Sequence, residues 1–385
     1  MDSYHETIRI ASINLFNFIA PPDAYYDFEN IYSHEQWAKK LGWFEAFFEE
    51  NQPDIIGFQE VFSPDELQSL MASLGYPHFA VLDTPELMGD YVYKSPVVAL
   101  ASRFPIVEMA LVQSAPQLCQ HIGVVADFSF SRKPLRATID LPQIGRCDVY
   151  VVHLKSKRND LGQGREVETE LDGGADLMAR QALGRVASNL QRATEAALLF
   201  HQIMLRRQNT SLPMVLMGDF NDSLSSSALE AFRVNPKQVY RADIEDKKLK
   251  AMFEVQLTQA LNHFCLFDSY DLYRHGAKLN QNLLQDEFES SLHEDDEENI
   301  SLSPSSSLSP CPNQWQRAST HYFGNTGSVL DYILVSSEFD ASQNASLGEV
   351  IDYQTFDRHL VRPDYERDKM STDHAPVMMT LAVRG

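Results

Sequence analysis

Short apolar runs recur from one end of the chain to the other. They are rich in β-branched and aromatic residues, and several are apolar at consecutive positions, as strands buried on both faces are. We therefore predict strands at IRIASI near residue 8, DIIGFQEV from 54, VVALASRF from 97, CDVYVVHLKS from 147, PMVLMGDF from 213, VLDYILVS from 329 and APVMMTLAV from 375.

Helical patterns lie between these runs. One helix face is predicted from apolar residues spaced by four, three and four: Trp37, Leu41, Phe44 and Phe48. Ser63, Pro64 and Glu66 predict a capping box at the start of a second helix, which ends at Gly75. A long helix is expected from about Asp176 to Arg207, with a buried stripe of Leu183, Val186, Leu190, Ala193 and Ala197. Strands that alternate with helices indicate α/β layers in which helices cover sheet faces.

Two polar stretches interrupt this pattern. Residues 157–175 are rich in Gly, Asp and Glu and predict a long polar loop. Residues 285–312 combine an acidic run with SLSPSSSLSPCP, a low-complexity composition that does not pack into a core. Because the motifs on both sides form one set, we predict a single domain over residues 1–385 with a disordered insertion at 285–312.

Composition and cysteine usage indicate a soluble globular protein. The chain has 385 residues, 44% of them hydrophobic, which is enough to bury a large core. The N-terminus lacks the basic start of a secretion signal, and no apolar run reaches the roughly 18 residues of a membrane span. Four cysteines lie far apart without metal or redox spacing and are interpreted as reduced thiols: Cys119, Cys147, Cys265 and Cys311. We therefore expect a cytoplasmic protein without a transmembrane segment.

The formal net charge of -22 opposes nonspecific attraction to nucleic acid or anionic lipid, because both are polyanions. Much of this charge lies in the acidic run at 286–298, so the remainder is less acidic than the average indicates. A polyanionic substrate must then be met by local basic residues or by cations. The candidates follow the predicted strand that starts at residue 147: Lys155, Lys157 and Arg158, with Arg192 on the next helix.

Polar residues at the ends of predicted strands form the candidate site, because sites in sheet proteins gather there. Taken alone, Glu60 after DIIGFQ fits a solvated strand end, and His153 in VYVVHLKSK fits a core histidine. The run PMVLMGDFND is more specific. It places Asp219 and Asn221 two positions apart, so both point the same way if the strand continues. The alternative is a turn that closes the strand.

Two further motifs lie near the C-terminus. SVLDYILVS places Asp331 inside an apolar strand, where a buried carboxylate needs a partner. STDHAPVMMTL places Asp373 beside His374 just before the last predicted strand. This pair provides the minimal set for one metal ligand and one phosphate-facing imidazole, and a helix cap or turn is the alternative.

The chain resembles the endonuclease/exonuclease/phosphatase family in an ordered set of motifs: IASINLFN, DIIGFQEV, VVHLKS, GDFND, LDYILVS and TDHAPV. This family includes DNase I, abasic-site endonucleases, inositol polyphosphate 5-phosphatases and bacterial neutral sphingomyelinases. The resemblance covers nearly the whole chain apart from the two polar stretches. It implies a four-layer αββα sandwich, in which two mixed β-sheets pack face to face with helices outside. It also implies that the single domain is catalytic, with the site at one edge.

The resemblance assigns a role to each motif residue. Asn14, Glu60 and Asp373 would lie at the metal, with Glu60 as chief ligand. Oxygen ligands without cysteine suit Mg2+ or Mn2+. Some family members carry an acidic residue two positions after the asparagine, where this chain has Phe16, so no second metal contact from this strand is predicted.

The remaining residues are assigned to the reaction itself. Asp219 would orient or deprotonate the attacking water, and Asn221 would hold the phosphate. His153 and His374 would contact the phosphate and stabilise charge as phosphorus becomes five-coordinate. Asp331 would hold His374 in one tautomer.

The resemblance therefore predicts a Mg2+- or Mn2+-dependent phosphodiesterase that acts on DNA or RNA. The segment RATEA around Arg192 favours nucleic acid, since it resembles the helix after the histidine strand in bacterial nuclease-like members. Within enzymes, the alternative is an inositol-phosphate phosphatase or a sphingomyelinase-like phosphodiesterase. The latter needs an exposed aromatic hairpin for membrane docking, for which only Tyr91 and Tyr93 are candidates. A non-catalytic binding module should have lost at least one of the seven core residues, and all are present: Glu60, His153, Asp219, Asn221, Asp331, Asp373 and His374.

Overall fold

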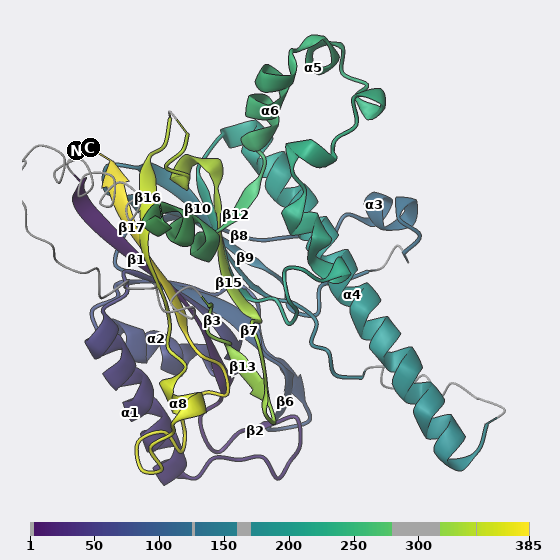
Figure 1. Ribbon diagram of the computed structural model, residues 1–385. Coiled ribbons are helices and arrows are strands. Elements are labelled where there is room, and N and C mark those ends of the chain that lie inside the picture. Colours follow the sequence, from purple (N-terminus) through teal and green to yellow (C-terminus); the bar gives the residue numbers. More distant parts are fainter. Residues whose placement is uncertain (1–3, 125–127, 160–170, 279–315, 344, 385) are drawn as a thin grey trace, which may run out of the picture.

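Two large mixed β-sheets form the centre of the protein. The structure is a computed structural model and describes residues 4–124, 128–159, 171–278, 316–343 and 345–384. Each large sheet has six strands, in the orders β16-β17-β1-β3-β7-β4 and β12-β15-β11-β10-β9-β8. The sheets face each other, with α1 and α2 on one outer side and α4 on the other (Figure 1). This is the predicted four-layer αββα sandwich.

The strands have the following bounds. The first sheet contains β1 (Tyr4–Phe18), β3 (Ile55–Val61), β4 (His78–Ala80), β7 (Val97–Ser102), β16 (Gly348–Thr355) and β17 (Val377–Arg384). The second contains β8 (Ile106–Leu111), β9 (Leu135–Leu141), β10 (Gly145–His153), β11 (Met214–Asp219), β12 (Leu266–Asp268) and β15 (Asp331–Ser336). There are also two small sheets. One contains β2 (Ala24–Tyr25), β6 (Val92–Ser95) and β5 (Glu86–Met88), and the other pairs β13 (His321–Phe323) with β14 (Thr326–Ser328). All seven predicted strands are confirmed.

The helices lie outside the sheets or in the connections between strands. The α-helices are α1 (His34–Asn51), α2 (Pro64–Ser73), α3 (Pro116–His121), α4 (Gly173–Thr210), α5 (Lys247–Ala251), α6 (Glu254–Asn262) and α8 (Arg358–Val361). Short 3-10 helices are η1 (Ser227–Arg233), η2 (Pro236–Gln238), η3 (Arg241–Asp243) and η4 (Ser337–Phe339). Among the described residues, no helix combines the length and the apolar composition that a membrane crossing needs.

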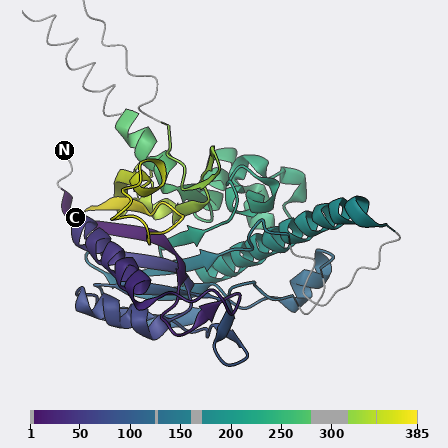
Figure 2. The ribbon, with the colours of Figure 1, turned by 90° about the horizontal axis from the view of Figure 1, so that it is seen from below.

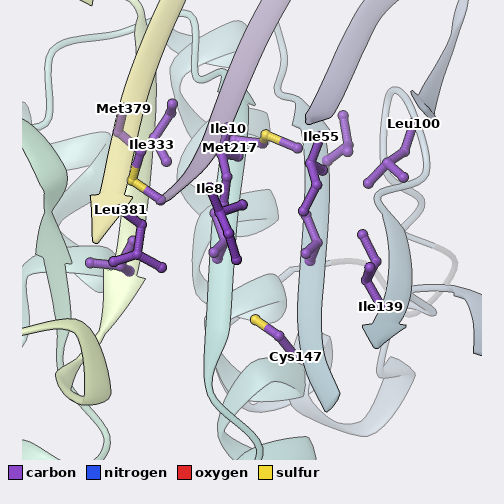
Figure 3. Packing of buried hydrophobic residues seen from close by; sticks show 14 of the residues in the cluster. Ile8, Ile10, Ile55, Leu100, Ile139, Cys147, Met217, Ile333, Met379 and Leu381 are labelled. Carbon is purple, nitrogen blue, oxygen red and sulfur yellow. The ribbon is translucent and has the colours of Figure 1, made fainter. Parts of the chain in front are cut away.

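Apolar side chains from both sheets interlock to form the main core (Figure 3). Ile10 and Ile55 from one sheet and Met217 from the other are fully buried in it. Each buried side chain of this size contributes about 2 kcal/mol of transfer free energy. The sheets approach so closely at Gly57 that an added Cβ would lie 2.9 Å from the Met217 side chain. This dry layer fixes the sheets against each other and therefore fixes the strand ends that carry the site.

Two predictions about the helices need correction. At α2, Ser63 is the N-cap residue, but its hydroxyl makes no cap hydrogen bond and accepts the Ala20 N–H at 2.9 Å, so the predicted capping box is absent. On α4, the predicted buried stripe is wrong, because Leu183, Val186 and Leu190 are 49%, 57% and 62% exposed. The N-terminal part of α4 projects beyond the sheets (Figures 1 and 2), so neither sheet covers these side chains in the described part of the chain.

The predicted polar stretches fall partly outside the described residues. The loop expected at 157–175 includes residues 160–170, which are not described, and α4 already begins at Gly173. The insertion expected at 285–312 lies wholly outside the described residues. Cys119, Cys147 and Cys265 are buried free thiols, and Cys311 lies outside the described residues.

Candidate active site

The strand register of the second sheet brings three predicted site residues side by side. His153 pairs with Asp219 across β10 and β11, and Asp219 pairs with Asp331 across β11 and β15. Gly218 makes this approach possible, since its φ is 150° and a Cβ there would lie 2.0 Å from the Val152 carbonyl oxygen. The side chains of all three site residues are almost completely buried at one end of the sheet.

Asp219 is the centre of this cluster. Its Oδ2 accepts hydrogen bonds from the Asn221 side chain at 3.1 Å and from the Asn14 side chain at 3.2 Å. The second of these bonds joins the two sheets, because Asn14 lies on β1. Oδ2 also lies 3.5 Å from Nε2 of His153 and 3.9 Å from Nε2 of His374. Four of the predicted residues therefore converge on one carboxylate oxygen of Asp219.

Burial controls the protonation of this centre. Loss of solvent raises the pKa of Asp219 to about 7, and the neighbouring Asp331 and Glu60 act in the same direction while His374 opposes them. Burial lowers the pKa of His153 well below its usual value, with Arg132 and His374 adding to the effect. A neutral imidazole beside a carboxyl group that titrates near neutral pH is an arrangement suited to proton transfer.

His374 is held by Asp331. Its Nδ1 lies 2.8 Å from Asp331 Oδ2, a hydrogen bond that leaves Nε2 directed toward the Asp219 side. Burial opposes the charged imidazolium, but Asp331, Asp219 and Asp373 together raise the pKa of His374 well above its usual value. The loop that carries His374 is fixed as well, since the Thr372 hydroxyl donates a hydrogen bond to the Asn14 carbonyl oxygen at 2.6 Å. The geometry thus suits the orienting role predicted for Asp331.

Glu60 and Asp373 lie at the edge of this cluster. Burial raises the pKa of Asp373 to about 6, and the charge of Glu60 adds to the shift. Within the described residues, no ion pair with a basic side chain neutralises either carboxylate. Buried oxygens without a hydrogen-bond partner include Asp373 Oδ1 and Asn17 Oδ1. Two carboxylates whose charges act on each other, together with unpaired oxygens, fit a hard divalent cation, which prefers oxygen ligands.

Two overlapping groups have ligand atoms within 4.8 Å of one another and could also hold an ion. One is Asp219, Asp331 and His374, and the other is His321, Asp373 and His374. In the first group, the Asp331–His374 hydrogen bond already occupies one atom of each partner. The second is more open, because His321 and Asp373 are only partly buried. The isolated bridge between His321 and His374 joins the second group to β13.

Three residues at the site escaped sequence analysis. Lys40 on α1 is fully buried, and its charge acts on Glu60 and Asp373, while burial lowers its own pKa to about 7. Arg132 acts electrostatically on His153 and donates to the Leu154 carbonyl oxygen at 3.3 Å. His321 on β13 bridges to His374, with ring centroids 4.9 Å apart. For Lys40 a signal existed, since it lies three residues after Trp37 and four before Phe44, on the apolar face.

The predicted substrate-binding residues separate into two groups. Lys157 and Arg158 are exposed, and Lys157 pairs with Asp222 at 2.7 Å. Lys155 is partly buried, and its backbone N–H donates to Glu195 at 2.7 Å. By contrast, Arg192 is 2% exposed. Its guanidinium donates to Asp222 at 2.9 Å and to the Lys155 carbonyl oxygen at 2.9 Å, so it lies behind the loop rather than on its surface.

Replacing Arg192 with alanine is therefore expected to lower the free energy of unfolding by about 3 kcal/mol, because one member of a buried ion pair is left without its partner. Urea unfolding followed by circular dichroism measures this change. Arg185→Ala is the matched control, since Arg185 is exposed on the same helix and should change stability by less than about 0.5 kcal/mol. Equal stability of the two variants would contradict the structural assignment of Arg192.

The chain is similar to a known protein family and to several solved structures. The sequence model of the family described as Endonuclease/Exonuclease/phosphatase family matches residues 30–374. No curated protein sequence matches significantly. Similar solved structures include a protein titled endonuclease/exonuclease/phosphatase from Beutenbergia cavernae, with 16% identity, 99% of this chain and 72% of that chain covered and a TM-score of 0.46. The catalytic domain of human Nocturnin has 15% identity, with 98% of this chain and 94% of that chain covered and a TM-score of 0.49. An AP endonuclease from Archaeoglobus fulgidus has 13% identity, with 97% of this chain and 98% of that chain covered and a TM-score of 0.47. Identities this low say nothing about the substrate.

Proposed function

The chain belongs to the endonuclease/exonuclease/phosphatase family and is a phosphoesterase of that family, and on this basis we propose that it hydrolyses phosphodiester bonds in nucleic acid with the help of Mg2+ or Mn2+. The observation that carries the proposal is the convergence of Asn14, His153, Asn221 and His374 on Asp219 Oδ2. We further propose that residues 1–385 act as one catalytic domain in the cytoplasm.

In this mechanism, Asp219 accepts a proton from the attacking water. The side-chain amides of Asn14 and Asn221 hold its Oδ2, and the Asn221 backbone N–H holds Oδ1 at 2.8 Å. A carboxyl group whose pKa lies near 7 can take up that proton at neutral pH without binding it too tightly. Fixing both oxygens orients the carboxylate toward one water position, which lowers the entropic part of the barrier.

His374 acts on the phosphoryl group. Its raised pKa favours the imidazolium form, and Asp331 accepts its Nδ1–H, so Nε2–H remains free to donate to a phosphoryl oxygen. A positioned donor of this kind stabilises charge as the five-coordinate phosphorus forms. His153, neutral because it is buried, offers a second contact. Glu60 and Asp373 would hold a divalent cation, which would neutralise charge on the substrate phosphate.

Arg158 supports the choice of nucleic acid. Its charge acts on Tyr26 and His321, which supports a position close to the site. The Arg158 side chain is exposed, and it forms no ion pair with a carboxylate of the described residues. Together with Lys157 it gives an acidic protein a local positive edge where a phosphate backbone can bind, and nucleic acid binding there should weaken steeply with salt.

A sphingomyelinase-like activity is the alternative, and one observation favours it. The β5–β6 hairpin exposes Leu87, Met88 and Tyr91 by 47%, 44% and 40%. Apolar side chains on a hairpin can enter the interfacial region of a membrane. Tyr93, the other aromatic candidate, is only partly exposed.

A substrate panel tests the proposal. Single-stranded DNA, duplex DNA, RNA, an inositol polyphosphate and sphingomyelin vesicles are assayed with Mg2+ and with Mn2+. We expect cleavage of at least one nucleic acid, and Arg158→Glu should lower its kcat/KM by about tenfold and reduce the salt slope by about one. Lys237→Glu on η2 makes the same charge change on an exposed residue of another region and should have little effect. Turnover of the lipid or inositol substrate, with every nucleic acid intact, would transfer the assignment to that class.

A further inference from the structure

Strand β1 carries a bulge directly opposite Glu60. In the pairing of β1 with β3, Asn14 aligns with Gln59 and Phe18 aligns with Val61. The residues of β1 between these pairs are Leu15, Phe16 and Asn17, whereas Glu60 stands alone on β3. Phe16, Asn17 and Glu60 all adopt left-handed backbone conformations, with φ of 49°, 57° and 61°. The bulge thus places three residues of β1 opposite a single residue of β3.

Only one side chain of the bulge brings an oxygen. Leu15 is fully buried in the apolar core under α1, and the ring of Phe16 lies 5.6 Å from the Lys40 ammonium. Asn17 is 5% exposed, and its backbone N–H donates to Glu60 Oε2 at 2.8 Å. Asn17 therefore lies in direct contact with the residue predicted to be the chief metal ligand.

Among the residues that the structure describes, the Asn17 side-chain oxygen has no hydrogen-bond partner, although it is buried. Leaving such an oxygen unpaired is unfavourable, because it has given up its hydrogen bonds to water, so unpaired buried oxygens call for an explanation. The left-handed backbone explains why asparagine is favoured over most residues there, but glycine would satisfy the backbone equally well. Asn14, by contrast, is already engaged, because its Oδ1 accepts the Phe16 N–H at 3.0 Å and its Nδ2 donates to Asp219.

We infer that Asn17 Oδ1 is a neutral ligand of the cation that Glu60 and Asp373 would hold, an inference that rests on the proposed function. Amide oxygens are ordinary ligands of hard divalent cations. Asp373 Oδ1 is likewise buried without a hydrogen-bond partner among the described residues, and the charge of Glu60 acts on Asp373. With Phe16 apolar, the bulge contributes no charge, and the cation is bound by two carboxylates and one amide. The resulting site is less acidic than one with three carboxylates.

Two substitutions separate the ligand role from the backbone role. Asn17→Gly keeps the left-handed conformation but removes the oxygen, whereas Asn17→Asp keeps an oxygen and adds charge. Titration with Mn2+, followed by the loss of the free-ion electron paramagnetic resonance signal, measures the dissociation constant without any substrate. We expect about tenfold weaker binding in Asn17→Gly and binding at least as tight as wild type in Asn17→Asp. Gln143→Gly is the control, because Gln143 is exposed and has a φ of 59°.

The outcomes are distinguishable. If wild type binds Mn2+ and Asn17→Gly binds it equally well, the ligand inference fails while the proposed function stands. If Asn17→Asp binds Mn2+ more weakly than wild type, the inference also fails, and this holds even if the glycine variant does not fold. If wild type itself binds no Mn2+, the proposed cation dependence fails independently of Asn17. Melting temperatures recorded without metal identify variants whose fold has changed.

Discussion

Replacing Glu60 with glutamine is expected to reduce phosphodiester hydrolysis by about a thousandfold while the protein stays folded. The amide keeps the shape of the side chain but removes the charge that would hold the cation. A bound metal ion contributes several kcal/mol to stabilising the transition state, and about 4 kcal/mol corresponds to a thousandfold in rate. Steady-state hydrolysis of a generic phosphodiester, measured over a range of Mg2+ concentrations, checks both the rate and the apparent metal affinity.

Glu45→Gln is the matched control for this experiment. Glu45 is exposed on α1, so losing its charge should change neither the rate nor the metal dependence. Circular dichroism and the melting temperature establish that both variants fold. Full activity of Glu60→Gln, or full activity of the wild type in excess EDTA, would contradict the cation-dependent mechanism.

Asp331→Asn is expected to lower kcat by about a hundredfold to ten-thousandfold, as loss of the orienting carboxylate does in catalytic triads. The effect should depend on pH. A group with a raised pKa stays protonated up to that pKa, so His374 in the wild type remains an imidazolium to higher pH than an ordinary histidine. Without Asp331, burial acts with less opposition and lowers the pKa of His374. The alkaline limb of the pH profile should therefore move to lower pH, and the loss of activity should be larger at pH 8 than at pH 6.

The pH profile distinguishes this role from a purely structural one. A variant that is merely less stable loses activity without shifting the alkaline limb. Asp140→Asn makes the same substitution on an exposed residue of β9 and should leave the profile unchanged. An unshifted alkaline limb in Asp331→Asn would show that the charge of Asp331 does not sustain the imidazolium.

Most of the fold could be predicted from the sequence, because buried strands need apolar side chains at consecutive positions. PMVLMGDF is an example, since its apolar residues are fully buried in β11 and deliver Asp219 to the strand end. The RATEA segment lies on α4, and the contacts that it makes there were not predictable from the sequence. The Glu195 carboxylate accepts backbone N–H groups from Ser131 and Lys155, at 2.7 Å each, and so fixes two loops near the site.

The rest could not be predicted because it depends on contacts distant in sequence. On α4, the apolar positions Leu183 and Leu190 suggested a buried face, yet the face that packs is Gly184 and Ser188. The Ser188 hydroxyl donates to the Arg158 carbonyl oxygen at 2.6 Å. Arg132 and His321 lie in no motif, and they reach the site only because β10, β13 and the His374 loop meet there. Periodicity reports which side of an element is apolar, not which neighbour it meets.

The strand order has a consequence for the order of folding. β17 lies between β16 and β1, so the central strand β1 keeps an unpaired edge until residues 377–384 have been synthesised. Asp373 and His374 lie just before β17. The hydrogen bond from the Thr372 hydroxyl to the Asn14 carbonyl oxygen joins residues that are 358 positions apart in the sequence. Contacts of such separation form slowly, and an open strand edge invites association with other chains. A nascent chain on the ribosome would therefore be inactive and prone to aggregation, and docking of β17 would complete the sheet and assemble the catalytic centre in the same step.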